Sequence, residues 1–202
     1  MTDFLIINAR LLTLAGESQP RRGSHLGDLG VIELGHLLVR GDKIAHVGEG
    51  IPAEDLIPEG EDIPIIDAFG RVVMPTFVDC HTHICWAGER FDEFEMGING
   101  ASYLEILESG GGIMSTVRAV REASQEDLAV DILSRIGLMS SLGTASVEIK
   151  SGYGLNTENE LKMLRAIHDA SQDVTQQIAG TFLGAHAIDP DQPNFVETTI
   201  HE

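Results

Sequence analysis

The chain has 202 residues, of which 43% are hydrophobic and 22% are charged, a balance typical of globular proteins. Its formal net charge of −19 at pH 7 argues against nucleic-acid backbones and anionic membrane surfaces as partners, because like charges repel. No apolar run approaches the ~20 residues of a membrane span, and the N-terminus lacks the basic start and apolar core of a secretory signal.

The first 70 residues predict a small β unit. Four apolar stretches have β character, at residues 3–14, 31–39, 43–47 and 63–66. Arg40-Gly41-Asp42 is typical of a hairpin turn between the second and third stretches, and the Gly, Ser and Pro content of residues 15–30 predicts a loop. We therefore expect residues 1–70 to form a β-sandwich-like N-terminal unit.

From residue 71 to residue 202 the pattern changes to strands alternating with helices. Further strands are predicted at residues 144–150 and 177–183, and helices are predicted to begin at Ser102, Ser124 and Thr157, each followed three residues later by an acidic residue. This alternation is typical of a parallel sheet with right-handed crossovers. An α/β barrel and an open doubly wound sheet both place their sites at the carboxyl ends of such strands, and the periodicity does not separate them.

The first strand of this part ends in Asp79-Cys80-His81-Thr82-His83. Because side chains alternate along a strand, His81 and His83 lie on one face, where two neutral imidazoles can bind a metal ion at about 2.0–2.1 Å. Two polar residues satisfied by hydrogen bonds or water are the alternative. Cys80 points to the opposite face, where we expect it to pack; Cys80 and Cys85 form no disulfide framework and fit a reducing cytoplasm.

Four longer strings make the chain resemble a known family. They are DCHTHICWAGERFDEFE (79–95), NGASYLEILESGGGIMSTVRAVREAS (99–124), VEIKSGYGLNTENELKMLR (147–165) and TFLGAHAIDP (181–190). The His-x-His strand after a small β unit resembles the metal-dependent amidohydrolase superfamily, and the combination of strings resembles its imidazolonepropionase family. The resemblance implies a partial TIM-like (β/α) barrel.

The resemblance also implies roles for individual residues. His81 and His83 match ligands of a single Zn or Fe ion. Arg90 matches an arginine that holds the substrate's propionate, for which a planar guanidinium suits a carboxylate; a surface ion pair with a neighbouring carboxylate is the alternative. Tyr153, between two glycines, matches a residue that contacts substrate, and His186 matches a substrate-binding histidine.

Three further polar residues receive no such role. Lys150 occupies a strand end where some relatives carry a carboxylated lysine that bridges two metals, but a single-metal site favours an ion pair between Lys150 and Glu148. Tyr103 stays unassigned. The acid–base residues of the family are expected beyond Glu202, so no catalytic residue is assigned within the chain.

The implied reaction is hydrolysis of the cyclic amide of 4-imidazolone-5-propanoate to N-formimino-L-glutamate by metal-activated water, in a cytoplasmic homo-oligomer. A complete barrel takes about 250 residues, whereas this chain supplies three barrel strands. We therefore expect it to be the N-terminal half of such an enzyme, and to be inactive without the other half or oligomer packing. Thr76 stands where the family commonly has glycine.

Two other functions compete with this one. Another cyclic amidohydrolase or deaminase, such as a dihydroorotase-like or guanine-deaminase-like protein, would share the His-x-His strand. A non-catalytic metal-binding or assembly module would keep the fold without the chemistry. The variant Arg90→Ala separates the first of these from the imidazolonepropionase interpretation: loss of binding of the propionate-bearing ring, with metal retained, supports imidazolonepropionase.

Overall fold

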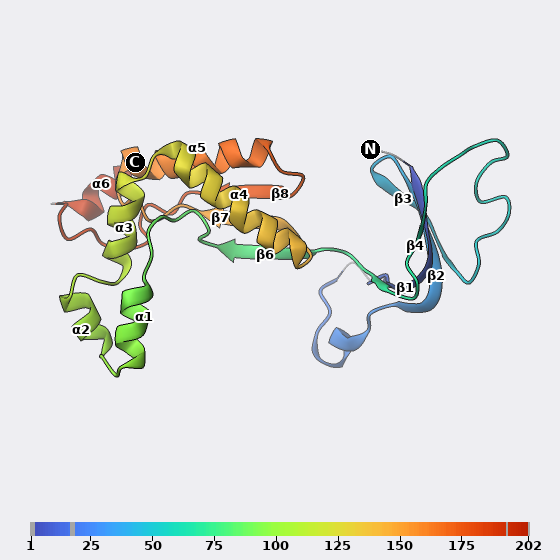
Figure 1. Cartoon of the computed structure of the whole chain (residues 1–202), viewed down its shortest axis with the longest axis horizontal. Coiled ribbons are helices and arrows are strands. Elements are labelled where there is room, and N and C mark those ends of the chain that lie inside the picture. The colour runs from blue at the N-terminus through green and yellow to red at the C-terminus, as the bar shows by residue number, and fades with distance from the viewer. Residues whose placement is uncertain (1–2, 17–18, 193, 202) are drawn as a thin grey trace. The chain divides into compact units, whose positions relative to one another are not determined.

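The computed structural model describes residues 3–16, 19–192 and 194–201. The chain divides into two compact units, Met1–Pro75 and Thr76–Glu202, while the sequence pattern places the division after residue 70. The first unit is built mainly of strands, and the second mixes strands with helices (Figure 1). The predicted mixed α/β class is confirmed. Closure of the second unit into a barrel stays a prediction, because its described strands form an open sheet.

The sheet of the first unit is organised around its first strand. The strand order is β3-β2-β1-β4, and β5 also pairs with β1. β1 and β2 run antiparallel, as do β2 and β3, whereas β4 and β5 run parallel to β1. The elements are β1 (Phe4–Leu12), the 3-10 helix η1 (Gly23–Gly27), β2 (Val31–Arg40), β3 (Lys43–Glu49), β4 (Ile65–Asp67) and β5 (Val72–Val73).

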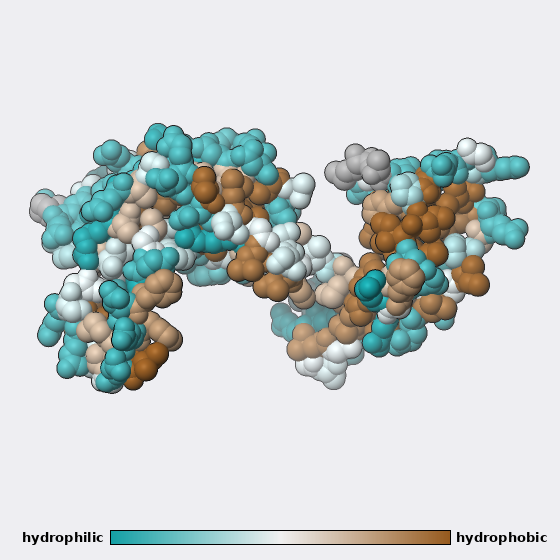
Figure 2. Space-filling model, in the orientation of Figure 1, coloured by the Kyte–Doolittle hydropathy of each residue, from teal (hydrophilic) through white to brown (hydrophobic). Residues whose placement is uncertain are grey.

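Local sequence explains this sheet. Gly41 has φ +60°, a left-handed conformation that glycine adopts without steric cost, and it turns β2 into β3 as predicted. Ala9 and Leu11 of β1 are buried in a small core with Ala68, and Ile6 packs against it. Hydrophobic side chains also gather on the surface of this unit (Figure 2), where apolar residues line a groove of about 330 Å³.

The second unit has three parallel strands in the order β6-β7-β8, as predicted. The long helices α4 and α5 precede and follow β7 in the chain and pack against each other and against the sheet (Figure 1). The strands are β6 (Phe77–Thr82), β7 (Thr144–Lys150) and β8 (Gln177–Thr181). The helices are α1 (Phe91–Ile98), α2 (Tyr103–Glu108), α3 (Ile113–Glu122), α4 (Gln125–Ser141), α5 (Thr157–Gln172) and α6 (Phe195–His201).

Capping and helical spacing fix these helices. Ser102 and Glu105 form the predicted capping box of α2, and the hydroxyl of Ser124 accepts from the backbone N–H of Asp127 at the start of α4. The apolar residues of α4 spaced four apart are fully buried; they are Leu128, Ile132 and Ile136. The unit's core forms where these residues meet apolar residues of β7 and α5.

Several sequence-based expectations are corrected. The N-cap of α5 is Asn156, one residue before the expected Thr157. β8 ends at Thr181, two residues earlier than expected, and Cys80 is exposed rather than packed. Helices α1, α3 and α6 were not anticipated. In the part of the chain that the structure describes, no helix is long and apolar enough to cross a membrane.

Candidate functional site

The carboxyl end of β6 directs two histidines to the same side of the sheet. Thr82, between them, is buried, and its hydroxyl donates to the backbone carbonyl of Glu148 on β7 (2.6 Å). Because side chains alternate along a strand, His81 and His83 lie on the face of the sheet opposite to Thr82. Their ring centroids lie 5.8 Å apart, close to the separation of about 5 Å that two imidazoles around one metal ion would have.

His83 lies at the centre of a group of rings. Its imidazole stacks on that of His186, with centroids 4.4 Å apart and an interplanar angle of 11°, and lies 5.4 Å from the ring of Tyr153. Burial, together with the nearby His186 and His81, lowers the pKa of His83, which favours the neutral imidazole that binds metal ions. The Nδ1 atom of His83 is buried and has no hydrogen-bond partner. This nitrogen fits a bound ligand.

Tyr153 is held by a loop that follows β7. Gly152 has φ +109°, and a Cβ there would lie 2.9 Å from the His186 side chain; at Gly154 a Cβ would lie 2.4 Å from the Glu160 nitrogen. Glycine is therefore required on both sides of Tyr153. Burial raises the pKa of the Tyr153 phenol, so its hydroxyl is a hydrogen-bond donor at neutral pH.

His186 follows β8 and is tied to the same loop. Its Nδ1 lies 3.0 Å from the carbonyl oxygen of Gly152. A carbonyl only accepts hydrogen bonds, so Nδ1 carries the proton and Nε2 of a neutral ring presents a lone pair. The backbone N–H of Leu183 donates to the hydroxyl of Ser151 (3.0 Å), which joins the two loops a second time.

Arg90 and Tyr153 line one pocket together with His83. The pocket has a volume of about 260 Å³ and is lined by His83, Trp86, Gly88, Glu89, Arg90, Thr116 and Tyr153. Arg90 also forms an ion pair with Glu93, whose Oε2 accepts from Nη2 (2.5 Å) and Nε (2.9 Å). The same oxygen accepts from the backbone N–H of Gly112 (3.0 Å). The surface ion pair considered as an alternative is thus present, and Arg90 faces the pocket as well.

Glu148 and Lys150 form an ion pair beside these histidines. Nζ of Lys150 lies 2.5 Å from Oε1 of Glu148, which also accepts from the Thr181 hydroxyl (2.8 Å). Oε2 of Glu148 is buried without a partner. Lys150 is therefore occupied by Glu148. Tyr103 is exposed on α2 and has no place in the pocket.

Metal binding is supported by part of a ligand set. In residues 3–16, 19–192 and 194–201, no three or more His, Cys, Asp or Glu side chains are placed to hold one ion. The imidazoles of His81 and His83 do lie close together. The Nδ1 atom of His83 has no hydrogen-bond partner, so it is free to bind a metal ion or to hydrogen-bond with a bound ligand. Catalytic zinc sites have three protein ligands and a water. His81 and His83 alone are therefore an incomplete ligand set for a catalytic metal ion.

A buried ion pair joins the Tyr153 loop to the segment after His186. Nη2 of Arg121 on α3 donates to Oδ2 of Asp189 (2.6 Å), and its Nε donates to the carbonyl of Gly154 (2.9 Å). Asp189 is 3% exposed. Sequence reasoning missed this pair, because Arg121 and Asp189 lie 68 residues apart and share no motif. It also missed the hydrogen bonds that the Glu160 carboxylate accepts from the loop before α5.

Replacing Asp189 with Asn should destabilise the protein in a pH-dependent way. Burial raises the pKa of Asp189, but hydrogen bonds from Arg121 and the Asp191 N–H outweigh it and lower the pKa. A lowered folded-state pKa stabilises above the unfolded pKa and loses that effect as the pH falls through the folded value. Urea unfolding should show a loss of about 3 kcal/mol at pH 7, which shrinks as the pH falls below the unfolded-state pKa of an aspartate, about 3.9.

The matched control is Asp173→Asn, at the exposed end of α5. It should leave the free energy of unfolding nearly unchanged at both pH values. A difference between D189N and the parent protein that stays constant from pH 7 to below pH 3 would contradict the assignment of this pair.

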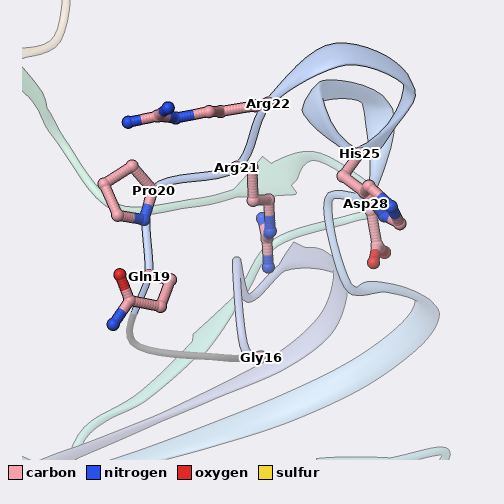
Figure 3. Close-up of a pocket in the computed structure, with 7 residues that line it drawn as sticks. All are labelled: Gly16, Gln19, Pro20, Arg21, Arg22, His25 and Asp28. Carbon is pink, nitrogen blue, oxygen red and sulfur yellow. The ribbon is translucent and has the colours of Figure 1, made fainter.

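A separate pocket lies in the first unit. It has a volume of about 500 Å³ and is lined by Gly16, Gln19, Pro20, Arg21, Arg22, His25 and Asp28 (Figure 3). Nη2 of Arg21 donates to the carbonyls of Leu14 (2.9 Å) and Ala15 (2.7 Å). This arginine therefore closes its own loop, and the pocket contains none of the residues singled out from the sequence.

No family model matches the chain, but curated proteins do. It is 42% identical over 209 aligned residues to an imidazolonepropionase of Alkaliphilus metalliredigens, covering 100% of this chain and 49% of the relative. It is 45% identical to one of Symbiobacterium thermophilum (94% and 44% covered) and 44% identical to one of Rubrobacter xylanophilus (100% and 49%). The chain spans about half the length of these relatives.

Solved structures share the fold at low sequence identity. A triazine hydrolase described as from Arthobacter aurescens matches with a TM-score of 0.63 and 15% identity, covering 100% of this chain and 41% of that one. A 5-methylcytosine deaminase from Klebsiella pneumoniae matches with a TM-score of 0.59 and 18% identity, covering 98% and 40%. At this identity the likeness concerns the fold alone.

Proposed function

We propose that this chain, which resembles imidazolonepropionases over its whole length, forms the substrate-binding half of an enzyme that hydrolyses 4-imidazolone-5-propanoate to N-formimino-L-glutamate. The observation that carries the proposal is the pocket in which Arg90, Tyr153 and His83 meet, with His186 stacked on His83. A guanidinium at one side and a cluster of imidazoles at the other suit a ring that bears a short carboxylate arm.

Each pocket residue has a defined part in this proposal. The edge of Arg90 that Glu93 does not occupy binds the propionate carboxylate, since a guanidinium offers five donors. The Tyr153 hydroxyl donates to the ring, and the Nε2 lone pair of His186 accepts from a ring N–H. These three contacts fix the orientation of the ring beside His81 and His83.

His81 and His83 would hold one Zn or Fe ion, which supplies Lewis-acid activation of water when bound. The contacts of Arg90, Tyr153 and His186 would place the ring carbonyl of the substrate next to that position, where His83 is partly buried. Two protein ligands are fewer than catalytic sites use. The proposal therefore expects the remaining ligands and the acid–base residues to come from a second half of the enzyme.

The proposal extends to the fold. On β6, Phe77 is 54% exposed and Val78 is 68% exposed, although apolar strand residues are normally covered. These two side chains point to opposite faces of β6, and the further strands and helices that complete a (β/α) barrel would cover both faces. We also propose a cytoplasmic homo-oligomer for the complete enzyme.

The test compares the 202-residue chain alone with the same chain combined with the second half of the Symbiobacterium thermophilum imidazolonepropionase, here called the reconstituted enzyme. Ring opening is followed by loss of absorbance of 4-imidazolone-5-propanoate. The proposal predicts turnover by the reconstituted enzyme only. Cytosine and an imidazolone without the propionate serve as competing substrates, and faster turnover of either would replace the proposed substrate.

A further inference from the structure

Glu160 is a fully buried carboxylate in the first turn of α5. It reaches back to the loop that carries Tyr153. Its Oε2 accepts from the backbone N–H of Gly152 (2.8 Å), and its Oε1 accepts from the N–H groups of Gly154 and Leu155 (2.8 Å each). Three N–H groups aimed at one carboxylate fix the backbone on both sides of Tyr153.

The contact with Gly152 extends to His186. The Gly152 N–H donates to Glu160, while the Gly152 carbonyl accepts from Nδ1 of His186. Gly152 has φ +109°, and its Cα approaches the His186 ring closely enough that a Cβ would collide with it. The position of this one glycine therefore decides both the orientation of His186 and which of its nitrogens carries the proton.

We infer that Glu160 is a positioning residue, which sets Tyr153 and the tautomer of His186 through the backbone of Gly152. It touches no substrate. Its carboxylate accepts the hydrogen bonds of three loop N–H groups that no neighbouring strand accepts. The loop in turn presents the phenol of Tyr153, and through Gly152 the Nε2 lone pair of His186, to the pocket. The inference rests on the proposed function for its kinetic test only.

The variant Glu160→Gln makes the inference specific. A glutamine has one acceptor oxygen, so it can satisfy Gly154 and Leu155 together or Gly152, but not all three. If its oxygen keeps the two bonds to Gly154 and Leu155, its NH₂ group faces the Gly152 N–H, donor against donor. Gly152 must then move away from the side chain, and its carbonyl, which belongs to the following peptide, moves with it and breaks the bond to His186 Nδ1.

In the reconstituted enzyme, we expect E160Q to lower kcat/KM for 4-imidazolone-5-propanoate on the order of 10- to 100-fold, as displaced supporting groups do. Bound metal per chain should stay unchanged. The matched control is Glu158→Gln, which makes the same chemical change at an exposed position in the same helical turn and should stay within about twofold of the parent enzyme.

A second readout does not depend on turnover. ¹⁵N NMR of the His186 ring should show Nδ1 protonated and Nε2 bare in the parent protein and in E158Q, and a mixture of tautomers in E160Q. If the parent enzyme shows no activity but E160Q still shows the changed His186 tautomer, the proposed function is contradicted while the role of Glu160 is supported.

Two results would overturn the inference. One is a folded E160Q with the parent's kcat/KM and the parent's His186 tautomer. The other is failure of both E160Q and Glu160→Asp, which keeps a carboxylate with a shorter reach, to give folded protein, because Glu160 would then be structural only. A folded E160D with an intermediate kcat/KM supports the inference.

Discussion

Replacing Arg90 with alanine is expected to lower kcat/KM for 4-imidazolone-5-propanoate in the reconstituted enzyme by roughly 100-fold, mainly through KM, corresponding to about 3 kcal/mol for a paired charged hydrogen bond. The substitution removes the propionate partner. It also leaves Glu93, whose carboxylate is largely buried beside the pocket, without its guanidinium, so that like charges repel the substrate.

Two comparisons separate these effects. Arg90→Ala combined with Glu93→Gln removes the repulsion and should recover part of the lost affinity. Arg165→Ala, which removes an exposed arginine of α5, should leave KM unchanged. Metal content should be the same in all these variants, and turnover of an imidazolone without the propionate should not respond to Arg90. Parent-like KM in R90A would contradict the assigned carboxylate site.

Replacing His83 with alanine should have the larger effect on chemistry. The variant removes a nitrogen from the metal site and the ring on which His186 stacks. Metal counted by mass spectrometry should fall well below one ion per reconstituted enzyme, and kcat should drop by about 10³-fold or more, since metal activation of water is worth several kcal/mol. His81→Ala should lose metal in the same way while keeping the His83–His186 stack.

His168→Ala is the matched control, because His168 lies exposed on α5. It should keep both metal and activity. If both H81A and H83A kept a full complement of metal, His81 and His83 would not be metal ligands and would be packing or hydrogen-bonding residues.

The sequence was most informative where a physical rule acts over a few residues. Alternation along β6 was enough to place His81 and His83 on one face, and the Ser124 cap with apolar residues four apart was enough for α4. The helix α3 was not predicted, although its buried Val117 and Val120 follow helical spacing.

Contacts between side chains and the backbone of loops were not predictable in this way. Glu160 matched a capping pattern with Thr157, while its carboxylate satisfies the loop before the helix, whose N–H groups meet no strand. The orientation of His186 depends on the carbonyl of Gly152, which precedes it by 34 residues. Cys80 was expected to pack, and it is exposed.

The most direct measurement of the central claim counts metal and turnover on one preparation of the reconstituted enzyme. The account predicts about one Zn or Fe ion per enzyme, and ring opening of 4-imidazolone-5-propanoate that is lost on chelation and returns when metal is restored. The isolated 202-residue chain should show neither full metal occupancy nor turnover. Ring opening that persists without metal, or a metal-replete enzyme that leaves this substrate intact, would contradict the account.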